Sequence, residues 1–178
     1  MKHDKEDNVR LFIAVLPDEN VRSALTDAQD ALRMHQFTGR YVSDWDLHMT
    51  LTFIGEYPDA DHVLETMAQV PVPPMTLTLG GYIGNFGDLL WAGADRDPVL
   101  AQYVKSLRHV LADQQIPFER MEFNPHITLL RRAYSPQSFA EITVRRETMP
   151  VRRISLMRSD LGRRGARYLE VGSVEVSV

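Results

Sequence analysis

The sequence contains no cysteine among its 178 residues, and this absence excludes several kinds of chemistry. Disulfides, zinc–thiolate sites, iron–sulfur clusters and cysteine nucleophiles all require that residue. No apolar run approaches the roughly 20 residues of a membrane span, and no signal-type hydrophobic block follows the charged N-terminus. We therefore expect a cytoplasmic protein that does not enter a membrane and whose chemistry uses His, Asp, Glu, Ser, Thr, Lys or Arg.

The chain also lacks the excess of positive charge that is typical of general nucleic-acid-binding proteins, because its net charge is −4. The charge is unevenly distributed: residues 1–130 carry 10 basic and 19 acidic side chains, whereas residues 131–178 carry 10 and 5. Every basic residue of the second segment is arginine, whose planar guanidinium suits bidentate contact with phosphate. The pattern indicates a local anion site, although a solvated charged face is its more common cause.

The composition is that of a globular protein, with 44% hydrophobic and 25% charged residues. We expect residues 1–178 to form one domain with two lobes. Apolar runs and alternating patterns predict strands at 11–15, 47–54, 75–79, 89–93, 127–130, 154–157 and 168–176. Apolar positions three and four residues apart predict helices after Asp18, after Asp59 or Asp61, and after Asp97. We expect a further helix at 136–146.

Proline and glycine divide this pattern into two similar halves. The segment 71–74 contains three prolines, cannot continue a helix, and is a plausible connector between lobes. Glycines predict turns at 80–87 and at the tip of a terminal hairpin, residues 162–165. Because strand–helix–strand–helix order occurs before Pro71 and again after Met75, the sequence predicts a duplicated α+β unit.

Each half contains one copy of the pattern His-x-Thr-Leu, with the two histidines 78 positions apart. Successive side chains of a strand point to opposite faces, so His48 and Thr50 share one face, as do His126 and Thr128. A single histidine on a strand is more often a hydrogen-bonded structural residue than a catalyst. Two matched copies favour a catalytic interpretation.

A pseudo-twofold axis between the halves would place the two motifs on opposite sides of one bound group. In-line displacement at phosphorus requires a base beside the entering oxygen and an acid beside the departing one. Histidine, with an ordinary pKa of about 6.5, can serve as either near pH 7. The threonine hydroxyls could donate hydrogen bonds to the phosphate oxygens and stabilise charge without a metal.

Two other kinds of site match the sequence less well. Threonine is a poor metal ligand, and no His-x-His or Glu-x-x-His motif accompanies the two histidines. A serine-type triad would need a Gly-x-Ser-x-Gly segment, which the chain lacks.

The motifs and their surroundings resemble the two-histidine phosphoesterase superfamily, and within it the RNA 2′,3′-cyclic phosphodiesterase family, also called the 2′-5′ RNA ligase family. The resemblance covers nearly the whole chain and includes residues 10–17, 47–56 and 125–131. It implies a bilobal α+β fold in which two antiparallel sheets line a central cleft with helices outside, and it implies no metal or cofactor. It further implies hydrolysis of 2′,3′-cyclic phosphate ends of RNA, tRNA fragments among them, to 2′-phosphates. Some members also catalyse reversible 2′-5′ joining of RNA ends.

By the same resemblance, His48 is the acid that protonates the departing O3′ and His126 is the base that activates water. The two motifs look alike, so the sequence does not separate these roles. Arg131 matches a family arginine suited to phosphate, and Phe53 could stack on a base. Strict alternation places each on the face opposite its histidine, so a bulge or strand end must re-aim it. The Arg163-Arg164 turn is a further expected contact for RNA phosphates.

Two alternative functions stay open. The first is a cyclic phosphodiesterase of small nucleotides, such as ADP-ribose cyclic phosphate. The second is a non-catalytic RNA-binding module, against which the presence of both histidines counts. We expect a monomer, and the sequence does not identify the physiological RNA or say whether ligation matters in the cell.

Overall fold

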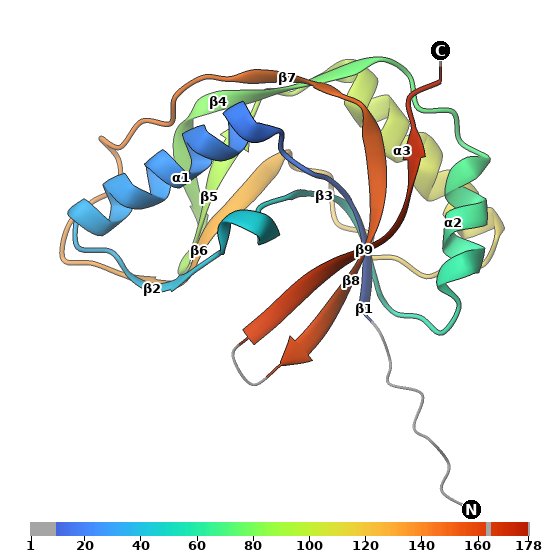
Figure 1. Ribbon diagram of the computed structural model, residues 1–178, viewed down its shortest axis with the longest axis horizontal. Coiled ribbons are helices and arrows are strands. Elements are labelled where there is room, and N and C mark those ends of the chain that lie inside the picture. The colour runs from blue at the N-terminus through green and yellow to red at the C-terminus, as the bar shows by residue number, and fades with distance from the viewer. Residues whose placement is uncertain (1–9, 163–164, 178) are drawn as a thin grey trace, which may run out of the picture.

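The structure is a computed structural model, and it describes residues 10–162 and 165–177 (Figure 1). The helices are α1 (Glu19–Met34), α2 (Ala60–Ala68) and α3 (Pro98–Asp113), with a short 3₁₀ helix at Asp44–Asp46. The strands are β1 (Arg10–Val15), β2 (Thr38–Tyr41), β3 (Met49–Glu56), β4 (Met75–Phe86), β5 (Leu89–Ala94), β6 (His126–Tyr134), β7 (Thr148–Val151), β8 (Arg153–Gly162) and β9 (Gly165–Glu175). None of the helices in these residues is long and apolar enough to span a membrane.

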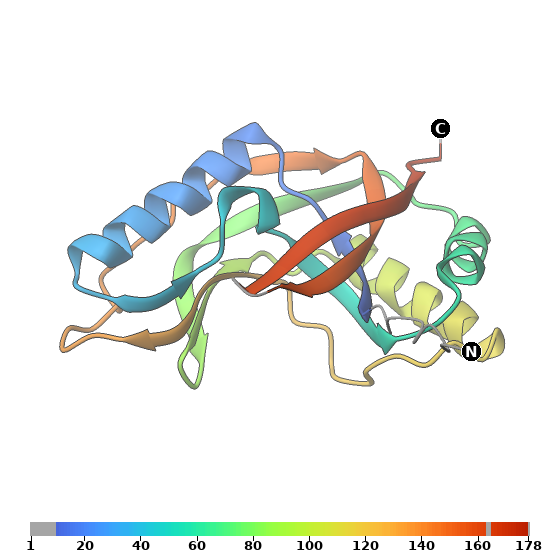
Figure 2. The same ribbon diagram turned by 60° about the horizontal axis from the view of Figure 1, so that its bottom comes forward.

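The strands form two antiparallel sheets, as the predicted α+β fold requires. One sheet has the order β3-β1-β8-β9 and the other the order β2-β6-β5-β4-β7. Helix α1 packs on β6 and β7, and helix α3 packs on β3 and β4, so the helices lie outside the sheets (Figures 1 and 2). The strands β3 and β6 contact each other where the two sheets meet.

The two sheets repeat one arrangement. The unit β1-α1-β3 corresponds to β5-α3-β6, and the order β3-β1-β8-β9 corresponds to β6-β5-β4-β7, with β2 added at the outer edge of β6. Each of these two helices contacts the sheet of the other unit: α1 contacts β6 and β7, and α3 contacts β3 in addition to β4 of its own unit. The predicted duplication is present in its first three elements.

The fourth element of the second copy was predicted as a helix at 136–146, and this prediction is wrong because the segment contains no helix. The side-chain oxygens of Ser135 and Ser138 each accept a hydrogen bond from the backbone N–H two residues later, at 3.0 and 3.1 Å. Such local bonds offer the backbone an alternative to the helix. Further along, Thr143 forms an isolated bridge with Tyr82 of β4.

Strand β4 is longer than predicted and includes most of the segment expected to form turns. The register of β4 against β5 shifts between Leu79 and Ile83, so the glycine-rich part bulges while it stays in the sheet. Gly81 lies in this bulge with a φ of 88°, a conformation that glycine adopts at no steric cost. The short strands β2 and β7 were not predicted, because four residues at a sheet edge leave no clear hydrophobic pattern.

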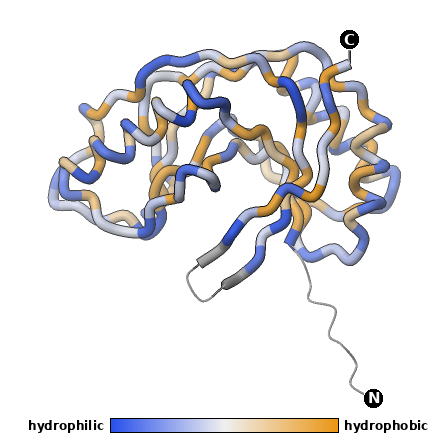
Figure 3. The backbone as a smooth tube through the Cα atoms, viewed as in Figure 1, coloured by the Kyte–Doolittle hydropathy of each residue, from blue (hydrophilic) through white to orange (hydrophobic). Residues whose placement is uncertain are grey.

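The predicted helix starts are confirmed. Side chains of Asp18, Asp59 and Asp97 each accept a hydrogen bond from a backbone N–H in the first turn of α1, α2 and α3. The main hydrophobic core lies between the sheets and the helices, and Figure 3 shows hydrophobic residues concentrated along the central strands. A second, smaller group lies on the opposite face of β1 and β8. It consists of Phe12, Ala14 and Met157, and we call it the cleft-face cluster.

Candidate active site

His48 and His126 are anchored in the same way, one just before β3 and the other at the first residue of β6. Nδ1 of His48 lies 2.7 Å from the carbonyl oxygen of Asp46, and Nδ1 of His126 lies 2.6 Å from that of Asn124. A carbonyl oxygen only accepts hydrogen bonds, so each Nδ1 carries a proton and donates it. In both rings Nε2 is therefore the atom left to accept or release a proton.

A β-bulge lies at the last residue of each His-x-Thr-Leu motif. Leu51 of β3 has no partner on β1, and Leu129 of β6 has no partner on β5, because the register shifts by one residue at each point. Two successive residues are buried at each bulge, and the alternation of the strand then resumes in the opposite phase.

The bulges re-aim Phe53 and Arg131 to the faces that carry the histidines. Each lies five positions after its histidine and is partly exposed; Phe53 lies between two buried residues, and Arg131 follows the buried Leu130 and precedes the exposed Arg132. The ring of Phe53 stacks 6.4 Å from Phe12, and Phe12 lies 4.8 Å from His48. The geometric objection that strict alternation raises for Phe53 and Arg131 is thus removed by the observed bulges.

Side chains from the two helices bind the carbonyl groups at these bulges. Nε2 of Gln29, on α1, donates to the carbonyl oxygen of Leu129 at 3.0 Å and to that of Val42 at 2.8 Å. Nη2 of Arg108, on α3, donates to the carbonyl oxygen of Leu51 at 3.2 Å. Gln29 and Arg108 each lie ten positions after the first residue of their helix, so they occupy equivalent places. We did not predict either, although a polar residue on an apolar helix face was a usable signal.

Each imidazole is flanked by two aromatic rings whose centroids lie 4.8–5.6 Å from its own. The flanking rings are Phe12 and Tyr168 at His48, and Phe86 and Trp91 at His126. Sequence reasoning missed this role for all four, because they come from other strands than the motifs. The rings form the immediate surroundings of both imidazoles.

Burial lowers the pKa of His48, because removal from water destabilises the imidazolium form. The positive charges of Arg131 and of protonated His126 lower it further, whereas the hydrogen bond to the carbonyl of Asp46 opposes the shift. Arg131 and His126 lie on β6, so residues of β6 act electrostatically on the histidine beside β3. The two motifs therefore lie within electrostatic reach of each other.

Thr50 and Phe53 of β3 and His126 of β6 line one cavity of about 160 Å³. Residues from the two motifs thus face a common space. The described lining of this cavity does not include His48, Thr128 or Arg131. Thr128 lies on the same face of β6 as His126, paired with Trp91 of β5.

The polar groups of the site suit proton transfer and anion binding. Within residues 10–162 and 165–177, no three His, Asp or Glu side chains come together as a metal-binding group. The expected contact at Arg163-Arg164 lies outside the described residues.

Comparison with known proteins identifies the family. A sequence model of the 2′-5′ RNA ligase superfamily matches residues 17–163, and the chain belongs to this superfamily. An RNA 2′,3′-cyclic phosphodiesterase of Thermus thermophilus is 32% identical over 174 residues, covering 90% of this chain and 86% of the relative.

Two solved structures of Escherichia coli LigT share the fold. The apo form has a TM-score of 0.81 and 25% identity, and the match covers 96% of this chain and 98% of LigT. The complex with 3′-AMP has a TM-score of 0.80 and 26% identity, over 96% and 99% of the two chains.

Proposed function

We propose that this protein hydrolyses 2′,3′-cyclic phosphate ends of RNA to 2′-phosphate ends, without a metal, by acid–base catalysis between His48 and His126. The matched anchoring of the two rings carries the proposal, because both Nδ1 atoms donate to backbone carbonyls and both Nε2 atoms are left for proton transfer. Membership of the superfamily and the named activity of the Thermus relative support the choice of substrate.

In this mechanism Nε2 of His126 accepts a proton from water while the water oxygen forms a bond to phosphorus. The bond between phosphorus and O3′ breaks, and Nε2 of His48 gives its proton to O3′. The product carries a 2′-phosphate and a free 3′-hydroxyl, and the two rings return to their starting states by exchange with solvent. With the 5′-hydroxyl of a second RNA in place of water, the same steps produce a 2′-5′ linkage.

The remaining residues act on the charge of the phosphate. Thr50 and Thr128 donate hydrogen bonds to its non-bridging oxygens, Arg131 supplies a positive charge, and Phe53 contacts a base. A bound phosphate anion counters the effect of Arg131 on His48 and raises the pKa of that imidazole again. Bound substrate therefore favours the protonated form of His48, which the role of an acid requires.

The test uses purified protein, excess EDTA and an oligoribonucleotide that ends in a 2′,3′-cyclic phosphate. We expect complete conversion to a 2′-phosphate end, identified by ³¹P NMR and by comparison with synthetic 2′- and 3′-phosphate standards. Formation of the 3′-phosphate, or loss of activity in EDTA that added metal restores, contradicts the proposal. A binding module without catalysis would give no conversion at all.

A further inference from the structure

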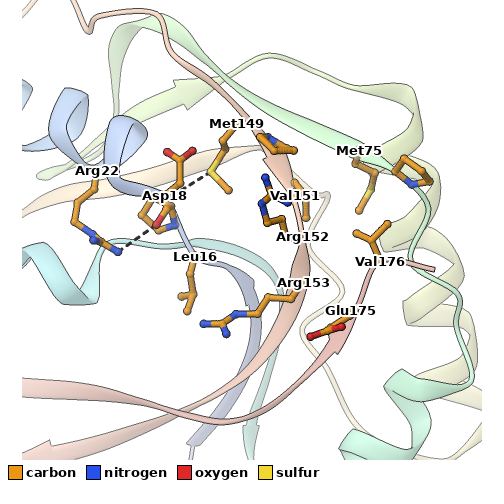
Figure 4. Close-up of a pocket in the computed structure, with 13 residues that line it drawn as sticks. Leu16, Asp18, Arg22, Met75, Met149, Val151, Arg152, Arg153, Glu175 and Val176 are labelled. Carbon is orange, nitrogen blue, oxygen red and sulfur yellow. Dashed lines mark hydrogen bonds between the residues drawn. The ribbon is translucent and has the colours of Figure 1, made fainter. Parts of the chain in front are cut away.

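A second and larger cavity, of about 770 Å³, lies where the start of α1, the corner between β7 and β8, and the end of β9 come together (Figure 4). Its lining includes three arginines. Arg22 lies in the first turn of α1, Arg152 lies between β7 and β8, and Arg153 is the first residue of β8. In Figure 4 the side chains of Arg22 and Arg153 approach Leu16 from two sides. The cavity is thus bordered by positive charge on several sides.

This cavity opens on the face of the sheet that carries His48. Leu16, one of its lining residues, packs against the cleft-face cluster, as does Tyr168, which flanks His48. The side chain of Arg153 pairs with Glu170 at 3.0 Å, and Glu170 is the partner of Met157, a member of that cluster. Paired residues of antiparallel strands lie on the same face, so Arg153 lies on the cleft side.

Trp45 connects the cavity to the catalytic histidine along the chain. It lies in the 3₁₀ helix, three residues before His48, and its side chain is 81% exposed. The guanidinium carbon of Arg22 lies 4.9 Å from the centre of its ring. An exposed aromatic ring beside a cation is the usual arrangement by which proteins hold a base and its phosphate in single-stranded nucleic acid.

Two of the three arginines have charge available for a ligand. Arg152 forms no ion pair within the described part of the chain, and Arg22 donates from Nη2 to the carbonyl oxygen of Pro17 at 3.2 Å while its Nε, in the same described part, is buried without a partner. Of the two carboxylates in the lining, Asp18 is engaged by the N–H of Val21 as a helix cap, and Glu175 lies beside Arg153 on the neighbouring strand. Arg153 is already paired with Glu170, so Arg22 and Arg152 are the two cations of the lining that are left to bind a ligand.

We propose that the RNA strand 5′ of the reacting phosphate runs over Trp45 and Arg22 into this cavity, where Arg152 binds a backbone phosphate. The proposal rests on the function proposed above and specifies its substrate as an oligonucleotide, whose nucleotides before the cyclic phosphate would occupy the cavity and contact Trp45. The cavity and Trp45 together form the binding track for the strand.

The test compares kcat/KM for a 2′,3′-cyclic mononucleotide with kcat/KM for a trinucleotide that ends in the same cyclic phosphate. The wild type should prefer the trinucleotide. The ratio of kcat/KM for the trinucleotide to kcat/KM for the mononucleotide should fall several-fold in Arg152→Gln and in Arg22→Gln. Trp45→Ala should lower this ratio about fivefold or more through lost stacking. Lys105→Gln removes an exposed positive charge on α3 and serves as the control, with the ratio unchanged.

Salt dependence gives a second readout. Each phosphate contact on a single strand contributes about 0.7 to the slope of log affinity against log salt concentration. The double variant Arg22→Gln and Arg152→Gln should reduce the slope for the trinucleotide by about 1.4. Arg152→Lys keeps the positive charge and should therefore retain the contribution of residue 152 to the slope.

The outcomes separate the two proposals. If the wild type opens both substrates with equal efficiency, or if the arginine variants keep the wild-type ratio and slope, the track is refuted while the proposed function stands. If the wild type opens neither substrate, the proposed function has failed and the track with it. Arg152 is exposed and unpaired within the described residues, so its variants are expected to fold, and thermal melts verify this.

Discussion

The half-sites around β3 and β6 share their backbone and differ in their side chains. Both have a histidine held by the carbonyl two residues earlier, a threonine two positions later, and a bulge that turns the fifth residue back toward the cleft. That fifth residue is Phe53 on one side and Arg131 on the other. The helix side chains that bind the bulges have the opposite distribution of charge. The charged Arg108 donates to a carbonyl of β3, and the neutral Gln29 donates to a carbonyl of β6.

The difference shows how a symmetric backbone can support an asymmetric reaction. The shared features hold the two imidazoles in the same way, each with Nδ1 bound to a backbone carbonyl and Nε2 left for proton transfer. Arg131 on β6 corresponds to the uncharged Phe53 on β3, and its charge adds to burial in lowering the pKa of His48. The predictions below test how far each half-site depends on its own features.

The largest effect is expected from removal of either imidazole. His48→Ala and His126→Ala should each lower kcat by about 10²- to 10⁴-fold, because each removes one proton transfer. Circular dichroism should show an unchanged fold. Wild-type rates in either variant contradict the mechanism.

A substrate with sulfur in place of the departing O3′ separates the two roles. Sulfur leaves without protonation, so His48→Ala should regain most of its rate on this substrate, whereas His126→Ala should not. Rescue of His126→Ala in place of His48→Ala reverses the assignment of acid and base.

The next largest effect is expected at Arg131. Arg131→Gln should lower kcat/KM by about 10²-fold, as loss of one stabilising charge at a reacting centre does in other enzymes. Removal of this cation should also raise the pKa of His48, measured by NMR titration of the ring. Arg132→Gln, one residue later and exposed, is the matched control. An unchanged pKa of His48 in Arg131→Gln excludes the proposed action across the cleft.

Smaller effects are expected at the supports of the bulges. Gln29→Leu removes this donor from the buried carbonyl of Leu129 and the partly buried carbonyl of Val42, and should lower the free energy of unfolding by about 1–3 kcal/mol. Arg108→Leu should cost less, since Arg108 is only partly buried. Gln102→Leu, at an exposed position of α3, is the control.

A positioning role for Gln29 predicts more than lost stability. Because Gln29 holds the bulge that aims Arg131, the effects of Gln29→Leu and Arg131→Gln on KM should be less than additive in the double variant. Additive effects indicate that Gln29 only stabilises the fold.

The smallest effect concerns pH. An acid whose pKa lies below the ordinary 6.5 loses its proton early as pH rises, so kcat/KM should begin to fall below pH 6.5. The descending limb of kcat should lie at higher pH, because bound phosphate raises the pKa of His48. A descending limb of kcat/KM above pH 6.5 that disappears in His48→Ala contradicts the lowered pKa.

The sequence predicted the helix starts, most strands and the two motifs, because each depends on local periodicity or capping. It did not predict the helix-free segment at 136–146, where serine side chains capture backbone N–H groups. It also could not locate the aromatic rings beside the histidines, because Tyr168 and His48 are far apart in the chain and meet only when β9 and β3 join the same sheet.

The sequence by itself determined which side chains could do the chemistry: two histidines, each with a threonine on the same face of a strand. Tertiary structure decided the rest. Alternation along an ideal strand places Phe53 and Arg131 on the wrong face, and only pairing with β1 and β5 produces the one-residue bulges that turn them back. Register between strands depends on contacts between distant segments, so no local pattern in the chain specifies it.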